Sequence, residues 1–131
     1  MDKIQVVIVE DEAIVSMGLR HELESFGYSV PAEFRTGEEA VEAVPHLLPD
    51  LVLMDIRLGE GMDGIETGAL IQGQFNVPVV YLTAYAVPDM LNRRELTEIF
   101  DCLTKPVASE HLRLAIDTAI LRYGSEGNPN S

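Results

Sequence analysis

The sequence of 131 residues is poor in cysteine, in positive charge and in long apolar runs. Cys102 is the single cysteine, which excludes an intramolecular disulfide and a metal site built from several thiolates. Apolar stretches such as Val6–Val9 and Leu51–Met54 are far shorter than the ~20 residues of a membrane-spanning helix. We therefore expect one compact soluble domain whose core needs no disulfide or structural metal.

Basic residues are scarce, since 9 Lys+Arg stand against 22 Asp+Glu, for a formal charge of −13. This charge repels phosphate backbones and anionic lipid surfaces, so direct binding of nucleic acid or membrane is disfavoured. Cations and basic protein surfaces are favoured as partners. The opening residues MDKIQ contain no apolar region of a secretory signal, which together with the single cysteine predicts a cytoplasmic location.

Short apolar runs alternate with longer segments of helical period, which is typical of β-α units on a parallel sheet. The predicted strands span 4–9, 28–34, 51–54, 77–83 and 101–104, and the predicted helices span 12–26, 36–45, 63–75, 88–100 and 109–123. With right-handed crossovers, this pattern predicts an α/β fold: a single flavodoxin-like (βα)5 doubly wound parallel sheet with strand order 2-1-3-4-5. The expected domain is 1–123, followed by a disordered polar tail at 124–131.

Local signals refine these elements. Pro31 cannot donate to a ladder, so the strand at 28–34 is expected at the sheet edge. Thr36 and Glu39 form a capping box that opens a helix, which Pro45 is expected to kink or end. Asp63 is expected to cap the following helix.

Polar side chains follow four of the predicted strands directly. They are Glu10, Asp11, Asp55, Thr83 and Lys105. Because the carboxyl ends of parallel strands meet at one edge of a sheet, we expect these side chains to line one rim. Each alone has a plain structural explanation as a helix cap, turn residue, strand residue or solvated charge. Five chemically complementary residues at adjacent strand ends instead favour a functional site.

The expected rim has the composition of a phosphoryl-transfer site. Three carboxylates within a few ångströms repel one another unless a cation joins them. Oxygen ligands without histidine or thiolate favour Mg²⁺, with Mn²⁺ as an alternative. A lysine and a hydroxyl opposite the cation can neutralise phosphoryl oxygens while an aspartate attacks phosphorus.

Four segments of the sequence resemble the receiver domains of two-component response regulators, and the resemblance spans Ile4 to about Tyr123. VVIVEDE resembles the family's acidic pair, and LVLMDIRLGEGMDGIE resembles its phospho-acceptor strand and loop. YLTAYA resembles its hydroxyl position with a small neighbour, and LTKP its lysine and proline.

The resemblance implies a role for each matching residue. Asp55 is the aspartate that a phosphohistidine donor on a sensor histidine kinase or phosphotransfer protein would phosphorylate. The implied Mg²⁺ ligands are Glu10, Asp11, Asp55 and the backbone carbonyl of Arg57. Thr83 and Lys105 would grip the phosphoryl oxygens, and Ala84 would keep the approach open. The bond between Lys105 and Pro106 would be cis.

The sequence also departs from the family at several positions. The loop RLGEGMDG after Asp55 is one residue longer than the commonest form and lacks its proline. Cys102 stands where the family often has an aromatic residue that couples to the hydroxyl position, and Val107 where phenylalanine is frequent. Arg57 and Tyr85 occupy positions that influence hydrolysis of the acyl phosphate, and a bulky pair there is expected to slow water attack.

The resemblance also implies a partner face, made by the segments 88–100, 101–104 and 109–123. Receivers use this face for dimerisation and output docking, and here it would carry Arg93, Arg94, Asp101 and Arg113. His21, His46 and His111 have no mutual spacing for a metal site and are expected at the surface.

The leading hypothesis is therefore a phosphorylation switch and not a turnover enzyme. One alternative is a phosphohydrolase with an aspartyl nucleophile, but Arg57 stands where such an enzyme would need a general acid. A second alternative is a degenerate receiver that only binds proteins, which the intact acceptor, hydroxyl and lysine disfavour. A flavin or nucleotide carrier is disfavoured because no glycine-rich phosphate loop follows the first strand.

Overall fold

The computed structural model describes residues 3–59, 61–83, 102–105 and 107–127, without the side chains of 123–127. Several sequence predictions lie outside the described residues: those on the helix at 88–100 and on Ala84, Tyr85, Arg93, Arg94, Asp101 and Pro106.

A five-stranded parallel sheet forms the centre of the molecule, with strand order β2-β1-β3-β4-β5. The strands are β1 (Val6–Val9), β2 (Glu33–Phe34), β3 (Leu51–Asp55), β4 (Val79–Thr83) and β5 (Cys102–Thr104). The central strands β1, β3 and β4 are buried along their whole length, because helices cover both faces of the sheet. The predicted flavodoxin-like fold and strand order are confirmed.

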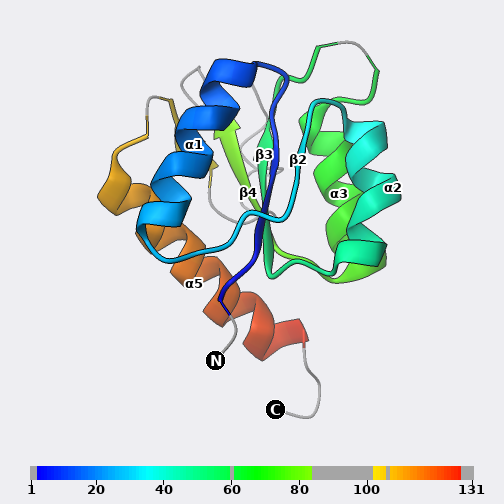
Figure 1. Cartoon of the computed structure of the whole chain (residues 1–131). Helices are drawn as coiled ribbons and strands as arrows, with labels where there is room; N and C mark the ends of the chain where they lie inside the picture. The colour runs from blue at the N-terminus through cyan, green and yellow to red at the C-terminus, as the bar shows by residue number, and fades with distance from the viewer. Residues whose placement is uncertain (1–2, 60, 84–101, 106, 128–131) are drawn as a thin grey trace.

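The described helices pack on both faces of this sheet (Figure 1). They are α1 (Ala13–Ser25), α2 (Gly37–Leu47), α3 (Gly64–Phe75) and α5 (Ser109–Gly127). Leu23 of α1 and Ile116 of α5 belong to one hydrophobic cluster, whereas Val44 of α2 and Ile71 of α3 belong to the cluster on the opposite face. Alternate residues of each strand point into the two clusters.

Two helices have the predicted N-cap residues, but α2 runs past Pro45. The hydroxyl of Thr36 accepts a hydrogen bond from the backbone N–H of Glu39 (3.2 Å), and the carboxylate of Asp63 accepts one from Glu66 (2.8 Å). Pro45 does not end α2, which continues to Leu47. Proline at this position removes the bond from residue 45 to the carbonyl of Val41, yet α2 continues for two more residues.

Two other elements differ in length from their predictions. The second strand has only two residues, and the earlier part of the predicted strand makes a single separate bridge, between Gln5 and Ser29. The break falls around Pro31, which cannot donate to the ladder. Helix α5 continues to Gly127, so 124–127 are helical where the sequence predicted the start of a disordered tail.

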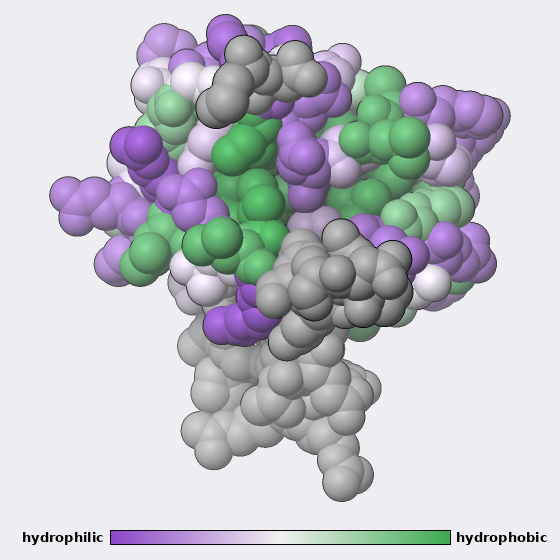
Figure 2. Space-filling model, turned by 90° about the horizontal axis from the view of Figure 1, so that it is seen from below, coloured by the Kyte–Doolittle hydropathy of each residue, from purple (hydrophilic) through white to green (hydrophobic). Residues whose placement is uncertain are grey.

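One face of the molecule shows how hydrophobic and hydrophilic residues are distributed. Seen from the end where the strands begin, hydrophobic residues gather toward the middle of the face and hydrophilic residues lie mostly along its rim (Figure 2). None of the helices in the described part of the chain has the length and apolarity to cross a bilayer.

Candidate functional site

The register of the sheet brings the predicted polar residues together at the carboxyl ends of the strands, at the top of Figure 1. Val9 pairs with Met54, Asp55 with Leu82, and Thr83 with Thr104. Glu10, Asp55, Thr83 and Lys105 therefore stand at the carboxyl ends of four adjacent strands. The predicted rim is present.

Three carboxylates meet at this edge. Ligand oxygens of Glu10, Asp11 and Asp55 all lie within 4.8 Å of one another. Glu10 is 1% exposed and Asp55 is 5% exposed, whereas Asp11 is more accessible to solvent. Two of the three acids are thus withdrawn from water, which makes their charge costly unless a cation compensates it.

Lys105 supplies part of that compensation. Its Nζ lies 2.6 Å from Oε1 of Glu10 and 3.4 Å from Oδ2 of Asp55. Burial would lower the pKa of Lys105, but the hydrogen bond to Glu10 and the charges of both acids outweigh it, so the net shift is upward. Burial raises the pKa of Glu10, although the hydrogen bond from Lys105 opposes that rise. One ammonium among three carboxylates leaves an excess of negative charge.

The donor set fits a hard divalent cation. All three side chains offer oxygen, which Mg²⁺ prefers, and none of the cluster is histidine or thiolate. Oxygens on opposite sides of Mg²⁺ are ~4.2 Å apart, so acids spread over up to 4.8 Å need only a small movement or a bridging water to share one ion. The residual negative charge favours such an ion.

Backbone contacts hold the acids in place. The N–H of Arg57 donates to Oδ1 of Asp55 (3.0 Å), and the N–H of Glu12 donates to Oε2 of Glu10 (3.2 Å). Gly64, at the start of α3, packs against the end of β3 so closely that a Cβ there would lie 2.0 Å from the carbonyl oxygen of Asp55. Only glycine permits this approach of α3 to the acceptor strand.

A backbone hydrogen bond links Thr83 and Lys105, the predicted hydroxyl and lysine residues. The N–H of Lys105 donates to the carbonyl of Thr83 (2.7 Å), and the Thr83 side chain is buried. Cys102 is half-buried in β5, and burial raises the pKa of its thiol, as expected of a small core residue. His21, His46 and His111 are exposed, as predicted.

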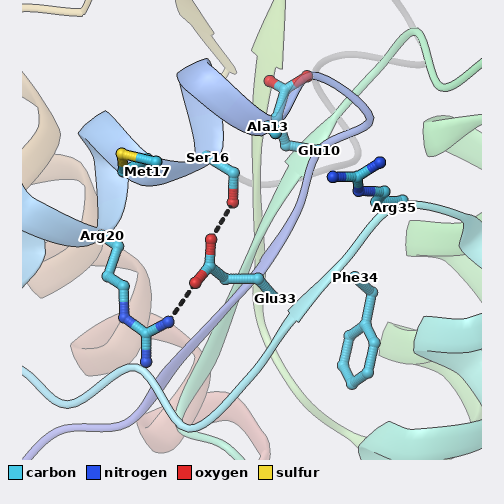
Figure 3. A pocket seen from close by; sticks show the side chains of 8 residues that line it. All are labelled: Glu10, Ala13, Ser16, Met17, Arg20, Glu33, Phe34 and Arg35. Atoms are coloured by element: carbon cyan, nitrogen blue, oxygen red, sulfur yellow. Dashed lines mark hydrogen bonds and ion pairs between the residues drawn. The ribbon is translucent and has the colours of Figure 1, made fainter.

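A pocket of about 420 Å³ lies beside Glu10, between α1 and β2 (Figure 3). Inside it, Ser16 and Arg20 both donate to the carboxylate of Glu33. Arg20 also donates to the carbonyl of Val30 (3.0 Å). Because Glu33 is fully engaged, it acts as a tie between α1 and the edge strand and not as a fourth acid of the cluster. The spacing of Ser16 and Arg20 by four residues was the only sequence signal for this tie.

Arg113 does not lie with β5 as the predicted partner face required. Its guanidinium carbon stands 5.7 Å from the centre of the Phe26 ring, at the end of α1. The side of α5 that borders β5 carries His111, Leu114 and Thr118 instead. Residues 113 and 114 point to different sides because successive helical residues are 100° apart.

Comparison with known proteins agrees with this geometry. Residues 6–117 match the response regulator receiver domain family. The chain is 35% identical over 119 residues to the transcriptional regulatory protein PdtaR of Mycobacterium tuberculosis, covering 91% of this chain and 58% of that protein. It is 32% identical to the phyllosphere-induced regulator PhyR of Methylorubrum extorquens, covering 88% of this chain and 43% of that protein. The chain therefore spans about half the length of these relatives.

Solved structures agree as well. The signal receiver domain of a modulated diguanylate cyclase from Desulfovibrio desulfuricans G20 is 38% identical, with a TM-score of 0.87 and coverage of 95% of this chain and 99% of that one. The PhyR receiver domain of Erythrobacter litoralis is 34% identical, with a TM-score of 0.76 and coverage of 92% of both chains. The chain belongs to the response regulator receiver domain family.

Proposed function

We propose that this receiver domain is switched by phosphorylation of Asp55, with the phosphoryl group coming from a phosphohistidine on a sensor histidine kinase or phosphotransfer protein. The observation that carries the proposal is the contact of Lys105 with two acids, Glu10 and Asp55, inside a cluster of three. A carboxylate nucleophile, an acidic cluster able to hold a divalent cation and an ammonium that can neutralise phosphoryl oxygens are the parts that phosphoryl transfer to a carboxylate needs.

Glu10, Asp11 and Asp55 would hold Mg²⁺, and the carbonyl of Arg57 is the proposed fourth protein ligand. Mn²⁺ would fit the same oxygens. When bound, the ion neutralises charge that develops on the phosphoryl oxygens. Cluster acids already stand within 4.8 Å of one another, which supports this assignment.

The chemical step belongs to Asp55. One carboxylate oxygen forms a bond to phosphorus while the phosphorus–nitrogen bond of the donor histidine breaks, and the electron pair stays on the imidazole nitrogen. Lys105 and Thr83 would hold the phosphoryl oxygens, with Ala84 leaving the approach open. The N–H of Arg57 already binds Oδ1 of Asp55, which orients the carboxylate before the donor arrives.

Phosphorylation then changes the charge at the rim. The acyl phosphate carries about 1.5 to 2 negative charges in place of the single charge of the Asp55 carboxylate, and its oxygens compete with Glu10 for Lys105. Lys105 directly follows β5, and its backbone N–H donates to the carbonyl of Thr83 at the end of β4. Movement of Lys105 would therefore act on the ends of both strands. We propose that this movement alters the surface formed by β5, α5 and the segment 88–100, where a second copy or an output domain would bind.

We propose a docking surface for the donor protein beside the site. A groove of about 470 Å³ between α1 and the segment that follows β5 is lined by residues that include Ile14, Gly18, Lys105 and Val107. Ile14 is 84% exposed, so a large apolar side chain is offered to solvent in the groove that Lys105 also lines. We propose that the helix bearing the phosphohistidine docks here, because the phosphoryl group must reach Asp55 from a neighbouring surface.

The decisive test is intact mass after incubation with Mg²⁺ and acetyl phosphate. Wild type should gain one phosphoryl group, whereas wild type with EDTA and Asp55→Asn should gain none. No gain in any sample would leave only the protein-binding alternative. Rapid release of inorganic phosphate over many turnovers from a phosphomonoester would instead favour the phosphohydrolase.

A further inference from the structure

Glu38, in the first turn of α2, contacts the far end of the loop that follows Asp55. Its Oε2 accepts a hydrogen bond from the backbone N–H of Met62 (2.9 Å). Gly61 lies against the same carboxylate, because a Cβ there would stand 2.7 Å from Oε2 and 2.9 Å from Oε1. Gly61 has a φ of +91°, which disfavours any other residue, so the loop needs glycine to reach Glu38.

The near end of the same loop touches the acid cluster. Arg57 donates its N–H to Oδ1 of Asp55 (3.0 Å), and a Cβ on Gly59 would stand 3.3 Å from Oδ2 of Asp11. The loop is therefore fixed to two cluster acids at one end and to Glu38 at the other.

The start of α2 is itself held rigidly. Thr36 caps the helix, and Gly37 packs so tightly on α3 that a Cβ would lie 2.0 Å from Oγ1 of Thr67 and 3.2 Å from the carbonyl of Met62. Glu38 consequently projects from a fixed base. A carboxylate that accepts a backbone N–H forms a stronger hydrogen bond than a neutral acceptor does.

We propose that Glu38 is a positioning residue for the phosphoryl site: by holding Gly61 and Met62, it keeps the backbone N–H of Arg57 against the Asp55 carboxylate. The inference rests on the proposed function, since it assigns Glu38 a role in Mg²⁺ binding at Asp55. It adds a residue of α2, outside the strand-end rim, to the groups that set metal affinity. Glu38 acts through the loop and touches none of the reacting atoms.

The test compares Mg²⁺ affinity, measured by isothermal titration calorimetry, among wild type, Glu38→Ala, Glu38→Gln and Glu42→Ala. Glu38→Ala should weaken binding roughly 10-fold, the lower end of the effect of losing a group that orients a metal ligand. Glu38→Gln should stay within about twofold of wild type, because its amide oxygen can still accept the Met62 N–H. Glu42→Ala removes an exposed acid of the same helix and is the control for lost charge.

Gly61→Ala is the second route to the same result, because it leaves α2 intact and pushes the loop away from Glu38. It should weaken Mg²⁺ binding in the same direction as Glu38→Ala. The amide NMR signal of Met62 in metal-free protein should move in Glu38→Ala and Gly61→Ala but not in Glu42→Ala.

The possible outcomes separate the two proposals. A wild type that binds Mg²⁺ and is phosphorylated, beside a Glu38→Ala variant of equal affinity, would overturn the role of Glu38 alone. A Glu38→Gln variant as weak as Glu38→Ala would overturn it too, since the acceptor would then not matter. A wild type that neither binds Mg²⁺ nor accepts a phosphoryl group would overturn the proposed function, whatever the Glu38 variants do.

Discussion

The ammonium of Lys105 lies closer to Glu10 than to Asp55, with Nζ 2.6 Å from Oε1 of Glu10 and 3.4 Å from Oδ2 of Asp55. Glu10 is the more deeply buried acid, so the stronger ion pair forms where charge is least hydrated. The acceptor thus keeps a weaker contact with Lys105. A new negative group on Asp55 can draw Lys105 away from Glu10 without breaking any other side-chain bond of the lysine that the described residues make.

Lys105→Met should destabilise the metal-free protein. The change leaves Glu10 buried without its cation and removes the neutralising charge beside Asp55. We expect a loss of about 1–3 kcal/mol in the free energy of unfolding, measured by urea titration in EDTA. Lys3→Met, at an exposed position, is the control and should stay near wild type. Equal stability of the Lys105 variant and wild type would show that the contacts carry no net energy.

Mg²⁺ should stabilise the wild-type fold. An ion that binds only the folded state at 100 times its dissociation constant adds about 2.7 kcal/mol to the free energy of unfolding. The gain should fall sharply in Asp11→Ala, because one of the three carboxylate ligands is lost while the hydrophobic core is untouched. Urea titrations with Mg²⁺ and with EDTA give the difference directly. A gain of equal size in the variant would place the ion elsewhere.

Gly64→Ala should disturb the acceptor strand. Its new methyl group would stand 2.0 Å from the Asp55 carbonyl oxygen, so α3 or β3 must shift at a cost of about 1–3 kcal/mol. Gly73→Ala is a matched control in the same helix, since no heavy atom lies within 4 Å of its Cβ position. That change should stabilise the protein by up to about 1 kcal/mol through helix propensity. Thermal unfolding of the two variants should move in opposite directions.

Tyr28 makes stability depend on alkaline pH. Its hydroxyl donates to Oδ1 of Asp117 (2.5 Å), and burial together with that carboxylate raises the pKa of Tyr28 to about 12 from a usual value of 10.0. The unfolded chain loses the phenol proton first, so this contribution is complete below pH 10 and disappears as pH rises through 12.

The Tyr28→Phe variant tests that contribution. It should be less stable than wild type by about 1 kcal/mol at neutral pH, because the hydrogen bond to Asp117 is lost. The difference should shrink between pH 10 and 12, as followed by urea titration at several pH values. A difference that stays constant over this range would show that the hydroxyl does not titrate as described.

Much of the fold was predictable, because the signals were local. Apolar runs such as Leu51–Met54 marked the buried strands, and Thr36 and Asp63 marked helix starts through their own side chains. The gathering of Glu10, Asp55 and Lys105 followed from parallel strand order alone. Each of these inferences needed only residues that are neighbours in sequence, or the rule that strand ends meet.

The remaining features depend on contacts between distant segments. Glu38 binds Met62 across 24 residues, and no local sequence pattern assigns Glu38 a role, whereas the capping pattern assigns one to its neighbour Glu39. Arg113 was assigned to the β5 side by its region, but its place on the helix turns it toward Phe26. The length of β2 was overestimated, because only Glu33 and Phe34, on the far side of Pro31, pair with β1 in a continuous ladder.

The most direct measurement is the position of the phosphoryl group. Wild type is incubated with Mg²⁺ and acetyl phosphate, the acyl phosphate is reduced with borohydride to a stable homoserine residue, and peptides are sequenced by mass spectrometry. Conversion at position 55, and its loss when Lys105 is replaced by methionine or EDTA is present, is the expected result. Conversion of Glu10, Asp11 or an acid outside the cluster, with position 55 unchanged, would contradict the assignment of Asp55 as acceptor.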